Sequence, residues 1–259
     1  MADRGLVAGS AGRLGWLRGL YPGYFALVMA TGILSSALRD VQQPVLSGVL
    51  LLIAVVCGAV LAVALMLRVV LFSGDVAADL AAPDRAYGFF TIVAACGVLS
   101  TRIAADGSLP AAAILGGVGL LVWVGLSYGI PVRLILGPRP QPVLAGVNGT
   151  WFVWVVGTQA LVVTIAGLSS AFPGLERAAG LAAVALWSVG VVLYLIVATL
   201  VLARLLLLEV RPEDLTPPYW VTMGATAITV LAAAQVVGMP GSPAIDATRP
   251  VITGLAIVL

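Results

Sequence analysis

Serine, threonine and glutamine are the side chains of this sequence best suited to handle a small solute, and they are unevenly distributed. Seven apolar stretches alternate between richer and poorer in these residues: the odd-numbered stretches hold 14 in 74 positions, the even-numbered ones 4 in 71. The stretches are 21–38, 45–67, 87–103, 109–130, 149–168, 178–203 and 219–237. Polar groups that face lipid cost free energy, whereas those that face a bundle interior or a water-filled path do not. The odd-numbered stretches are therefore predicted to lie inside and the even-numbered ones to face lipid.

The spacing of these hydroxyls places several of them on common helix faces. Thr222, Thr226 and Thr229 recur at i, i+4 and i+7, and Thr31 and Ser35 at i and i+4. A path lined with hydroxyls offers an ion hydrogen-bond partners in place of water. The candidate pore-lining residues are Thr31, Ser35, Thr91, Thr101, Thr158, Thr164, Thr222, Thr226 and Thr229. The alternative is that these side chains only hydrogen-bond helices to one another.

The residues that the sequence lacks exclude other chemistry. It contains neither His nor Lys, so the imidazole proton shuttle, the imidazole metal site and the Ser-His pair are excluded, and no enzyme, metal or cofactor is expected. No Asp, Glu or Lys falls in the middle of a stretch, where proton-coupled pumps usually place an ionisable group. This favours passive movement of anions. A net charge of +2 is too small to suggest nucleic acid as a partner.

The elements that carry these side chains are predicted to be membrane-spanning helices. Apolar residues make up 61% of the chain and charged residues 9%, with a mean hydropathy of +1.15. A bilayer core about 30 Å thick needs about 20 helical residues, which is the length of the seven stretches. An eighth stretch begins near Pro250 and runs to Leu259, half a span. We predict an all-α integral membrane protein with seven complete spans and a partial eighth, truncated at its C-terminus.

The spans fall into pairs that repeat along the chain. An aromatic doublet opens each odd span, at intervals of 65, 62 and 68 residues: Tyr24-Phe25, Phe89-Phe90, Trp151-Phe152 and Tyr219-Trp220. A glycine follows inside each of these spans, at Gly32, Gly97, Gly157 and Gly224. This pattern predicts a repeat of helical hairpins. Their approximate bounds are 21–71, 87–136, 149–208 and 219–259, which together form a transmembrane domain over 21–259.

Arginine fixes the expected orientation, because cytoplasmic loops are enriched in positive charge. The N-terminal segment and the loops on its side hold nine arginines, and the opposite loops hold four, Arg39, Arg102, Arg177 and Arg249. Residues 1–20 are therefore predicted to be cytoplasmic. The use of Arg without Lys, beside abundant Ala and Gly, is typical of a GC-rich bacterium. We expect a multi-pass protein of the bacterial inner membrane.

The chain resembles the tellurite-resistance/dicarboxylate transporter family, which is related to the plant slow-type anion channels. The resemblance runs from about residue 20 to the end. It is carried by YPGYFALVMATGIL (21–34), PDRAYGFFT (83–91), NGTWFVWVVGTQ (148–159) and LTPPYWVTMGA (215–225). The resemblance implies ten helices in five hairpins around a central pore, kinks in the inner helices near Gly32, Gly97, Gly157 and Gly224, and a homotrimer. It also implies a phenylalanine gate on a ninth helix, whereas this sequence ends in the eighth.

Three functions remain open at this stage. The leading hypothesis is transport of small anions, either a C4-dicarboxylate or an inorganic oxyanion such as tellurite or sulfite, through a pore between the odd helices. The second is a proton-coupled dicarboxylate exporter on the same scaffold. The third is a membrane subunit that transports nothing and uses its Thr and Gly residues only for helix packing.

Overall fold

A computed structural model describes residues 15–138, 142–172, 174–239 and 242–259. Within these residues the secondary structure is helical and contains no strand, as the sequence predicts. Residues 1–14 of the expected cytoplasmic segment lie outside the described residues, and so do Arg4, Arg13 and Arg139 of the orientation argument.

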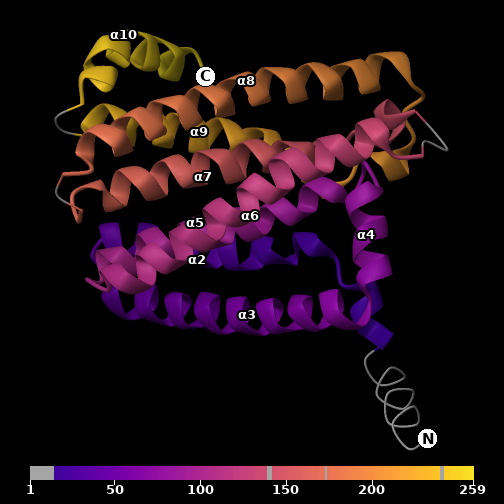
Figure 1. Ribbon diagram of the computed structural model, residues 1–259, viewed down its shortest axis with the longest axis horizontal. Helices are drawn as coiled ribbons and strands as arrows, with labels where there is room; N and C mark the ends of the chain where they lie inside the picture. The colour runs from indigo at the N-terminus through magenta and orange to yellow at the C-terminus, as the bar shows by residue number, and fades with distance from the viewer. Residues whose placement is uncertain (1–14, 139–141, 173, 240–241) are drawn as a thin grey trace, which may run out of the picture.

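Short 3₁₀ turns connect longer α-helices along the chain (Figure 1). The α-helices are α2 (Ala26–Asp40), α3 (Pro44–Leu71), α4 (Ser73–Ala81), α5 (Phe90–Ala105), α6 (Leu109–Leu136), α7 (Phe152–Ser169), α8 (Glu176–Leu207), α9 (Val221–Gly238) and α10 (Pro243–Val258). The 3₁₀ turns are η1 (Gly15–Gly19), η2 (Pro22–Phe25), η3 (Ala86–Phe89), η4 (Val143–Gly146), η5 (Gly149–Trp151), η6 (Pro212–Asp214) and η7 (Pro217–Trp220).

Each aromatic doublet lies where a 3₁₀ turn passes into an inner helix. The turns η2, η3, η5 and η7 run directly into α2, α5, α7 and α9. Proline in the first two positions of η2 and η7 suits a helix start, because its missing N–H would be unpaired there in any case. In η5 the Asn148 side chain accepts a hydrogen bond from the Thr150 backbone N–H at 2.8 Å instead. The predicted hairpin repeat is thus confirmed at the level of local structure.

The inner helices form a row in the order α2, α5, α7 and α9, and their partners lie outside it (Figure 1). In the most apolar part of each helical segment, 61% of residues are buried for α5 and 67% for α7, against 11% for α3 and 17% for α6. The alternation is weaker at the end of the row, where α8 and α9 are each 28% buried. Within the described residues α9 has one inner neighbour, α7, whereas α5 and α7 lie between two, so the polar residues of α9 are less covered.

The ends of the two terminal helices differ from the sequence expectation. Six helical segments of the described residues are long and apolar enough to cross a membrane, and α2 and α10 are not among them. Helix α2 has only 15 residues and ends on the charged pair Arg39-Asp40. Helix α10 begins at Pro243, with Pro250 inside it, so a start near Pro250 was wrong. Its first turns carry Asp246 and Arg249. Because these residues are charged, hydropathy alone did not predict this part of the helix.

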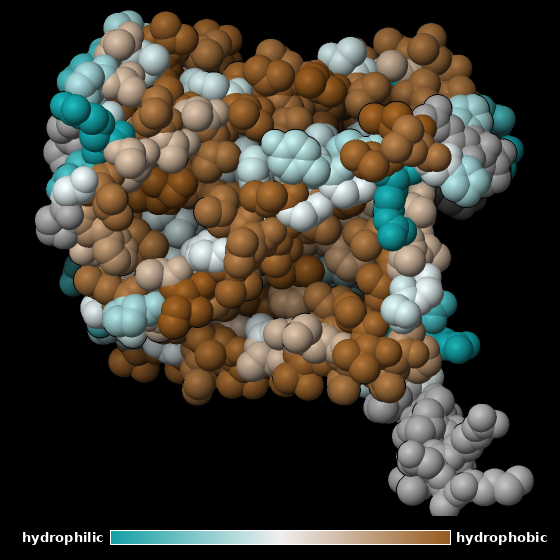
Figure 2. Space-filling model, viewed as in Figure 1, coloured by the Kyte–Doolittle hydropathy of each residue, from teal (hydrophilic) through white to brown (hydrophobic). Residues whose placement is uncertain are grey.

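Apolar residues cover the middle of the molecular surface, and hydrophilic residues gather toward the two ends of the long helices (Figure 2). Large apolar side chains on α3 and α6 are widely exposed, including Val45, Val70 and Leu121. Exposed apolar area of this extent has no counterpart on a monomeric protein in water. The surface is that of a protein whose outer helices contact lipid.

Close backbone approach holds neighbouring repeats together. At Gly97 of α5, a Cβ atom would lie 3.1 Å from the Ala160 carbonyl oxygen of α7. At Gly149 of η5, a Cβ atom would lie 2.2 Å from the Pro218 carbonyl oxygen of η7. Only a residue without a side chain fits at Gly149, since the atom in the way belongs to the backbone.

Candidate functional site: a cavity between the inner helices

Residues of all four inner helices line a cavity of about 520 Å³. Helix α2 contributes Ile33 and Ser36, and α5 contributes Gly97, Val98 and Thr101. Helix α7 contributes Ala160 and Val163, and α9 contributes residues from Gly224 to Gln235. The odd-numbered spans predicted to lie inside therefore share one hollow space.

The cavity extends over about half of a bilayer. Gly224 and Gln235 are eleven residues apart on α9, which corresponds to roughly 16 Å of α-helix. A hydrocarbon core is about 30 Å thick. Along this length the lining is uncharged, and the charged lining residues Arg39, Asp40 and Arg102 come from the C-terminal turns of α2 and α5. We call this charged end of the cavity the arginine mouth.

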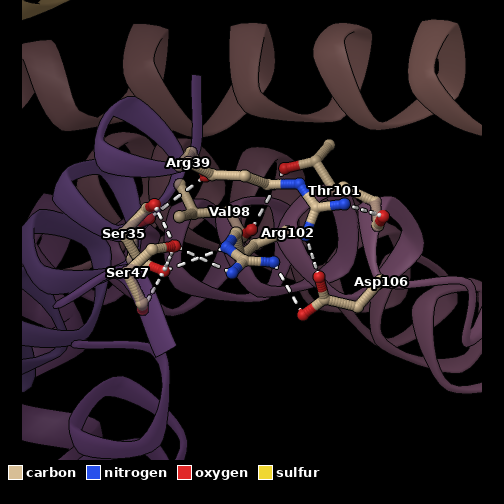
Figure 3. Close-up of polar contacts among 10 residues, drawn as sticks. Ser35, Arg39, Ser47, Val98, Thr101, Arg102 and Asp106 are labelled. Carbon is tan, nitrogen blue, oxygen red and sulfur yellow. Dashed lines mark hydrogen bonds and ion pairs between the residues drawn. The ribbon is translucent and has the colours of Figure 1, made fainter. Parts of the chain in front are cut away.

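Arg102 is the buried member of the arginine mouth, with only 4% of its surface exposed. Its Nε donates to Ser35 Oγ of α2 at 2.9 Å, and its Nη2 donates to Ser47 Oγ of α3 at 2.9 Å (Figure 3). Each serine donates its own proton to the backbone carbonyl of the other at 2.7 Å. The two hydroxyls therefore act on Arg102 as acceptors, and they hold its guanidinium in one orientation.

Asp106, which directly follows α5, joins Arg102 to Arg39. Arg102 Nη1 lies 2.7 Å from one carboxylate oxygen, and Arg39 Nη1 donates to the other (Figure 3). Arg39 Nη2 also donates to the Ala105 carbonyl at 2.6 Å. The Arg102 guanidinium, with a smaller contribution from Arg39, lowers the pKa of Asp106, so this carboxyl group is ionised at neutral pH. Its side chain is 39% exposed.

Among the predicted pore-lining hydroxyls, Thr101 lies on the cavity. Its hydroxyl donates to the Gly97 carbonyl at 3.1 Å and the Val98 carbonyl at 3.0 Å, both one turn earlier in α5. Thr31 and Thr222 are part-buried and bond in the same local way to Leu27 and Tyr219. A bond to the preceding turn leaves the hydroxyl oxygen as an acceptor and occupies its proton.

The remaining predicted hydroxyls lie between helices. Ser35, Thr91, Thr158, Thr164 and Thr229 are buried, with exposures of 0–4%. Thr91 donates to the Pro22 carbonyl at 3.0 Å, which ties η2 to α5. Thr158 accepts from Trp123 Nε1 of α6 at 2.8 Å. Thr226 meets the Tyr194 hydroxyl of α8 at 2.9 Å. Thr164 lines a separate groove of about 270 Å³ beside α6. The role of these hydroxyls in lining a pore stays a prediction.

The four glycines of the repeat also divide between cavity and packing. Gly97 and Gly224 line the cavity. Gly32 faces Val98 of α5, and Gly157 faces Phe90 of α5. Each inner helix runs without interruption between its stated bounds. The predicted kinks at these positions stay a prediction.

The sequence argument missed the arginine mouth. It counted Arg39 and Arg102 as loop charges that set the orientation, whereas both belong to inner helices. One signal was available: Arg102 and Asp106 are four residues apart, the spacing of an ion pair along a helix. Within the described ranges, no group of three Cys, Asp, Glu or His side chains gathers as a metal site would require.

Most of the chain matches the model of a known family. A model of the SLAC1 family, described as voltage-dependent anion channel, matches residues 19–258. Two membrane proteins of Mycobacterium tuberculosis, Rv1735c of strain H37Rv and MT1776 of strain CDC 1551, are 56% identical to this chain over 66 residues. Both are described as uncharacterized. The match covers 26% of this chain and only 34% of the length of these curated relatives.

Proposed function

We propose, from the premise that this chain belongs to the voltage-dependent anion channel (SLAC1) family, that it carries small anions across a membrane through the cavity between α2, α5, α7 and α9. Membership of the family implies anion transport through a membrane channel. The observation that carries the finer proposal is the position of the cavity: the inner helices bound it jointly, and two arginines stand at its mouth.

The charges along the cavity favour anions over cations. Its charged lining consists of Arg39, Arg102 and one carboxylate, Asp40. Because Arg102 is 4% exposed, water screens its charge poorly, and opposite charges interact more strongly there than in bulk water. Beyond the mouth the lining carries no charge that would repel an anion. Both guanidinium groups are paired with Asp106, so their positive charge acts fully on an anion when that carboxylate moves away.

Passive conduction accounts for the lining better than proton coupling does. No Asp or Glu of the described residues lines the cavity between Gly224 and the arginine mouth. Asp106 is held ionised by Arg102, which makes it a poor proton carrier near neutral pH.

The substrate class is a C4-dicarboxylate or an inorganic oxyanion such as tellurite or sulfite. The competing function is a subunit that transports nothing, and it is supported by the hydroxyls already satisfied within or between helices.

The proposed setting is the bacterial inner membrane, with residues 1–20 on the cytoplasmic side and the protein assembled as a homotrimer. The described arginines support this orientation. Arg68, Arg133 and Arg204 belong to the last turns of α3, α6 and α8, and these helices end on the side of the molecule that holds α4 (Figure 1). Arg18 and Arg85 pair with Asp75 and Asp79 of α4, and Arg211 follows shortly after the end of α8. The opposite end holds Arg39, Arg102, Arg177 and Arg249.

Flux from proteoliposomes tests the proposed function. The purified chain is reconstituted, and efflux of malate, sulfite and chloride is compared with efflux of potassium. Ala227→Trp fills the cavity lining of α9, and Leu121→Trp adds the same side chain to a residue of α6 that is 75% exposed on the lipid-facing side. We expect anion flux that Ala227→Trp abolishes and Leu121→Trp preserves. Potassium flux, or anion flux that survives Ala227→Trp, would refute the proposal.

A further inference from the structure

We infer that Arg39 and Arg102 form a binding site for a carboxylate-like anion at the mouth of the cavity, and that the Asp106 carboxylate occupies this site as a tethered competitor. The inference deepens the proposed function and rests on it for its physiological meaning. The binding site itself follows from the contacts of three side chains.

The receptor half of the site is rigid. Two nitrogens of the Arg102 guanidinium, Nε and Nη2, donate to the serine hydroxyls, and the third, Nη1, is buried without a hydrogen bond and forms an ion pair with Asp106. The serines come from α2 and α3 and are 0% and 1% exposed. A guanidinium held from behind in this way presents its remaining nitrogen toward the mouth at little further cost in side-chain entropy.

The ligand half of the site is more exposed than the receptor half. Asp106 follows the last residue of α5 and begins the three-residue link to α6, in which Gly107 has a φ of +90°. The Asp106 side chain is 39% exposed, whereas that of Arg102 is 4% exposed. Rotation of one exposed side chain is therefore enough to vacate the site. The backbone and the buried serines need not move.

The contacts of Asp106 define the chemistry that the site accepts. Its two oxygens are divided between two guanidiniums, one from α2 and one from α5. A planar anion with two adjacent oxygens reproduces this arrangement, as any carboxylate does. The titratable and charged groups that face Asp106 are Arg39 and Arg102, with Asp40 of the cavity lining nearby. These two arginines and two aspartates balance in charge, so an incoming carboxylate has to displace Asp106 and cannot simply bind beside it.

Removal of the tethered carboxylate should tighten binding of a free one. Formate serves as the probe because it is the smallest carboxylate, and its binding to the purified chain is measured by titration calorimetry. A site that its own side chain fills nine-tenths of the time binds an external ligand about tenfold more weakly than an empty one. Asp106→Asn should therefore increase formate affinity on the order of tenfold or more. Asp246→Asn, which removes the partner of Arg249 on α10, is the matched control and should change nothing.

The arginine variants complete the test. Arg102→Gln in the Asp106→Asn background should abolish formate binding, whereas Arg102→Lys should retain part of it, because Lys keeps the charge but not the planar geometry. A thermal melt of each variant identifies loss of fold. Arg39→Gln tests the same binding site through its other arginine. Unchanged formate affinity in a folded Asp106→Asn protein would overturn the inference.

Binding and flux separate the inference from the proposed function. Tighter formate binding in Asp106→Asn without anion flux from liposomes would support the site and refute conduction. Anion flux that Ala227→Trp abolishes, combined with formate binding that ignores Asp106 and Arg102, would support conduction and refute the site.

Discussion

Two buried arginines at opposite ends of the molecule each form an ion pair with an aspartate, but the two pairs have different roles. Arg68 of α3 is 1% exposed and Arg102 of α5 is 4% exposed, and each lies 2.7 Å from the carboxylate of an aspartate farther along the chain. Asp79, the partner of Arg68, is only 12% exposed and is bound at the same time by Arg85. Asp106, the partner of Arg102, is 39% exposed and lies on a turn beside the cavity.

The difference shows that burial of a charge does not by itself mark a functional site. Arg68 also donates to the Arg18 carbonyl at 2.9 Å, so it links η1, α3 and α4 at a point away from the cavity. Its role is to hold elements together. Arg102 lines the cavity, and its partner can be exchanged. We therefore assign stability to the first arginine and anion recognition to the second.

The largest effect on stability is expected for the ion pair between Arg68 and Asp79. Asp79→Asn leaves Arg68 buried without a counter-charge, and breaking a buried pair costs about 3–5 kcal/mol of unfolding free energy. The melting temperature of the purified protein should fall steeply. Asp75→Asn removes an exposed pair with Arg18 and should cost under about 1 kcal/mol. Equal melting temperatures for the two variants would erase the distinction between the two arginines.

A smaller effect on folding and a larger one on transport are expected at the arginine mouth. Arg102→Lys keeps one charge but cannot contact both serines and Asp106 together. Loss of one charge-assisted hydrogen bond corresponds to about 1.5–3 kcal/mol, which is roughly 10- to 100-fold in anion affinity. Anion flux at low substrate concentration should fall accordingly, with a melting temperature above that of Asp79→Asn. Flux equal to that of the unaltered chain would contradict the assignment.

Removal of single hydroxyls should have modest effects, on anion flux at one position and on stability at another. Thr101 lies on the cavity, and its hydroxyl proton can turn from the Gly97 and Val98 carbonyls toward a passing anion, so Thr101→Val should lower anion flux about twofold through loss of that donor. Thr229 is 0% exposed and bonds to the Ala225 carbonyl at 2.6 Å. Thr229→Val should leave flux intact and cost about 1 kcal/mol of stability. If Thr229→Val reduced flux as much as Thr101→Val did, the cavity would not be the path.

The smallest effect concerns pH. The Arg102 guanidinium lowers the pKa of Asp106, and the backbone N–H of Arg211, with Arg204, lowers the pKa of Asp214. A carboxyl whose pKa is depressed by folding stabilises the fold above its unfolded pKa of about 3.9, and this contribution is lost as pH falls through the folded pKa. Flux and melting temperature should therefore be flat between pH 5 and 8. A flux transition inside that window would indicate a titrating group other than these two.

The sequence predicted the repeat because the repeat is local. The aromatic doublets open the inner helices through 3₁₀ turns, and the hydroxyl census predicted that the odd-numbered spans lie inside, as the burial of α5 and α7 confirms. The match to the family model over residues 19–258 confirms the resemblance seen in four segments. The site was harder to predict, since the contacts that define it join residues far apart in the chain. Ser35 and Arg102 are 67 residues apart, and only the packing of α2 on α5 brings them together.

Hydroxyl counts do not distinguish a residue that lines a cavity from one that packs against a helix. A threonine that bonds to the preceding turn, as Thr101 and Thr229 both do, looks the same in sequence whether it faces a cavity or a neighbouring helix. Helix spacing gives the face but not what lies against it. Arg102 was a better indicator of the site than any threonine, because an arginine in an inner helix cannot be buried without a partner.

Accessibility of a cysteine in the cavity tests the central claim most directly. In a background with Cys57 and Cys96 replaced by serine, Ala227→Cys places a thiol in the cavity and Leu121→Cys places one toward lipid. Each protein is treated in liposomes with methanethiosulfonate reagents that are matched in size and carry a negative or a positive charge. We predict that Ala227→Cys reacts faster with the anionic reagent, that Arg102→Gln removes this preference, and that Leu121→Cys reacts with neither. An unreactive Ala227→Cys thiol, or one that prefers the cationic reagent, would contradict an anion path between the inner helices.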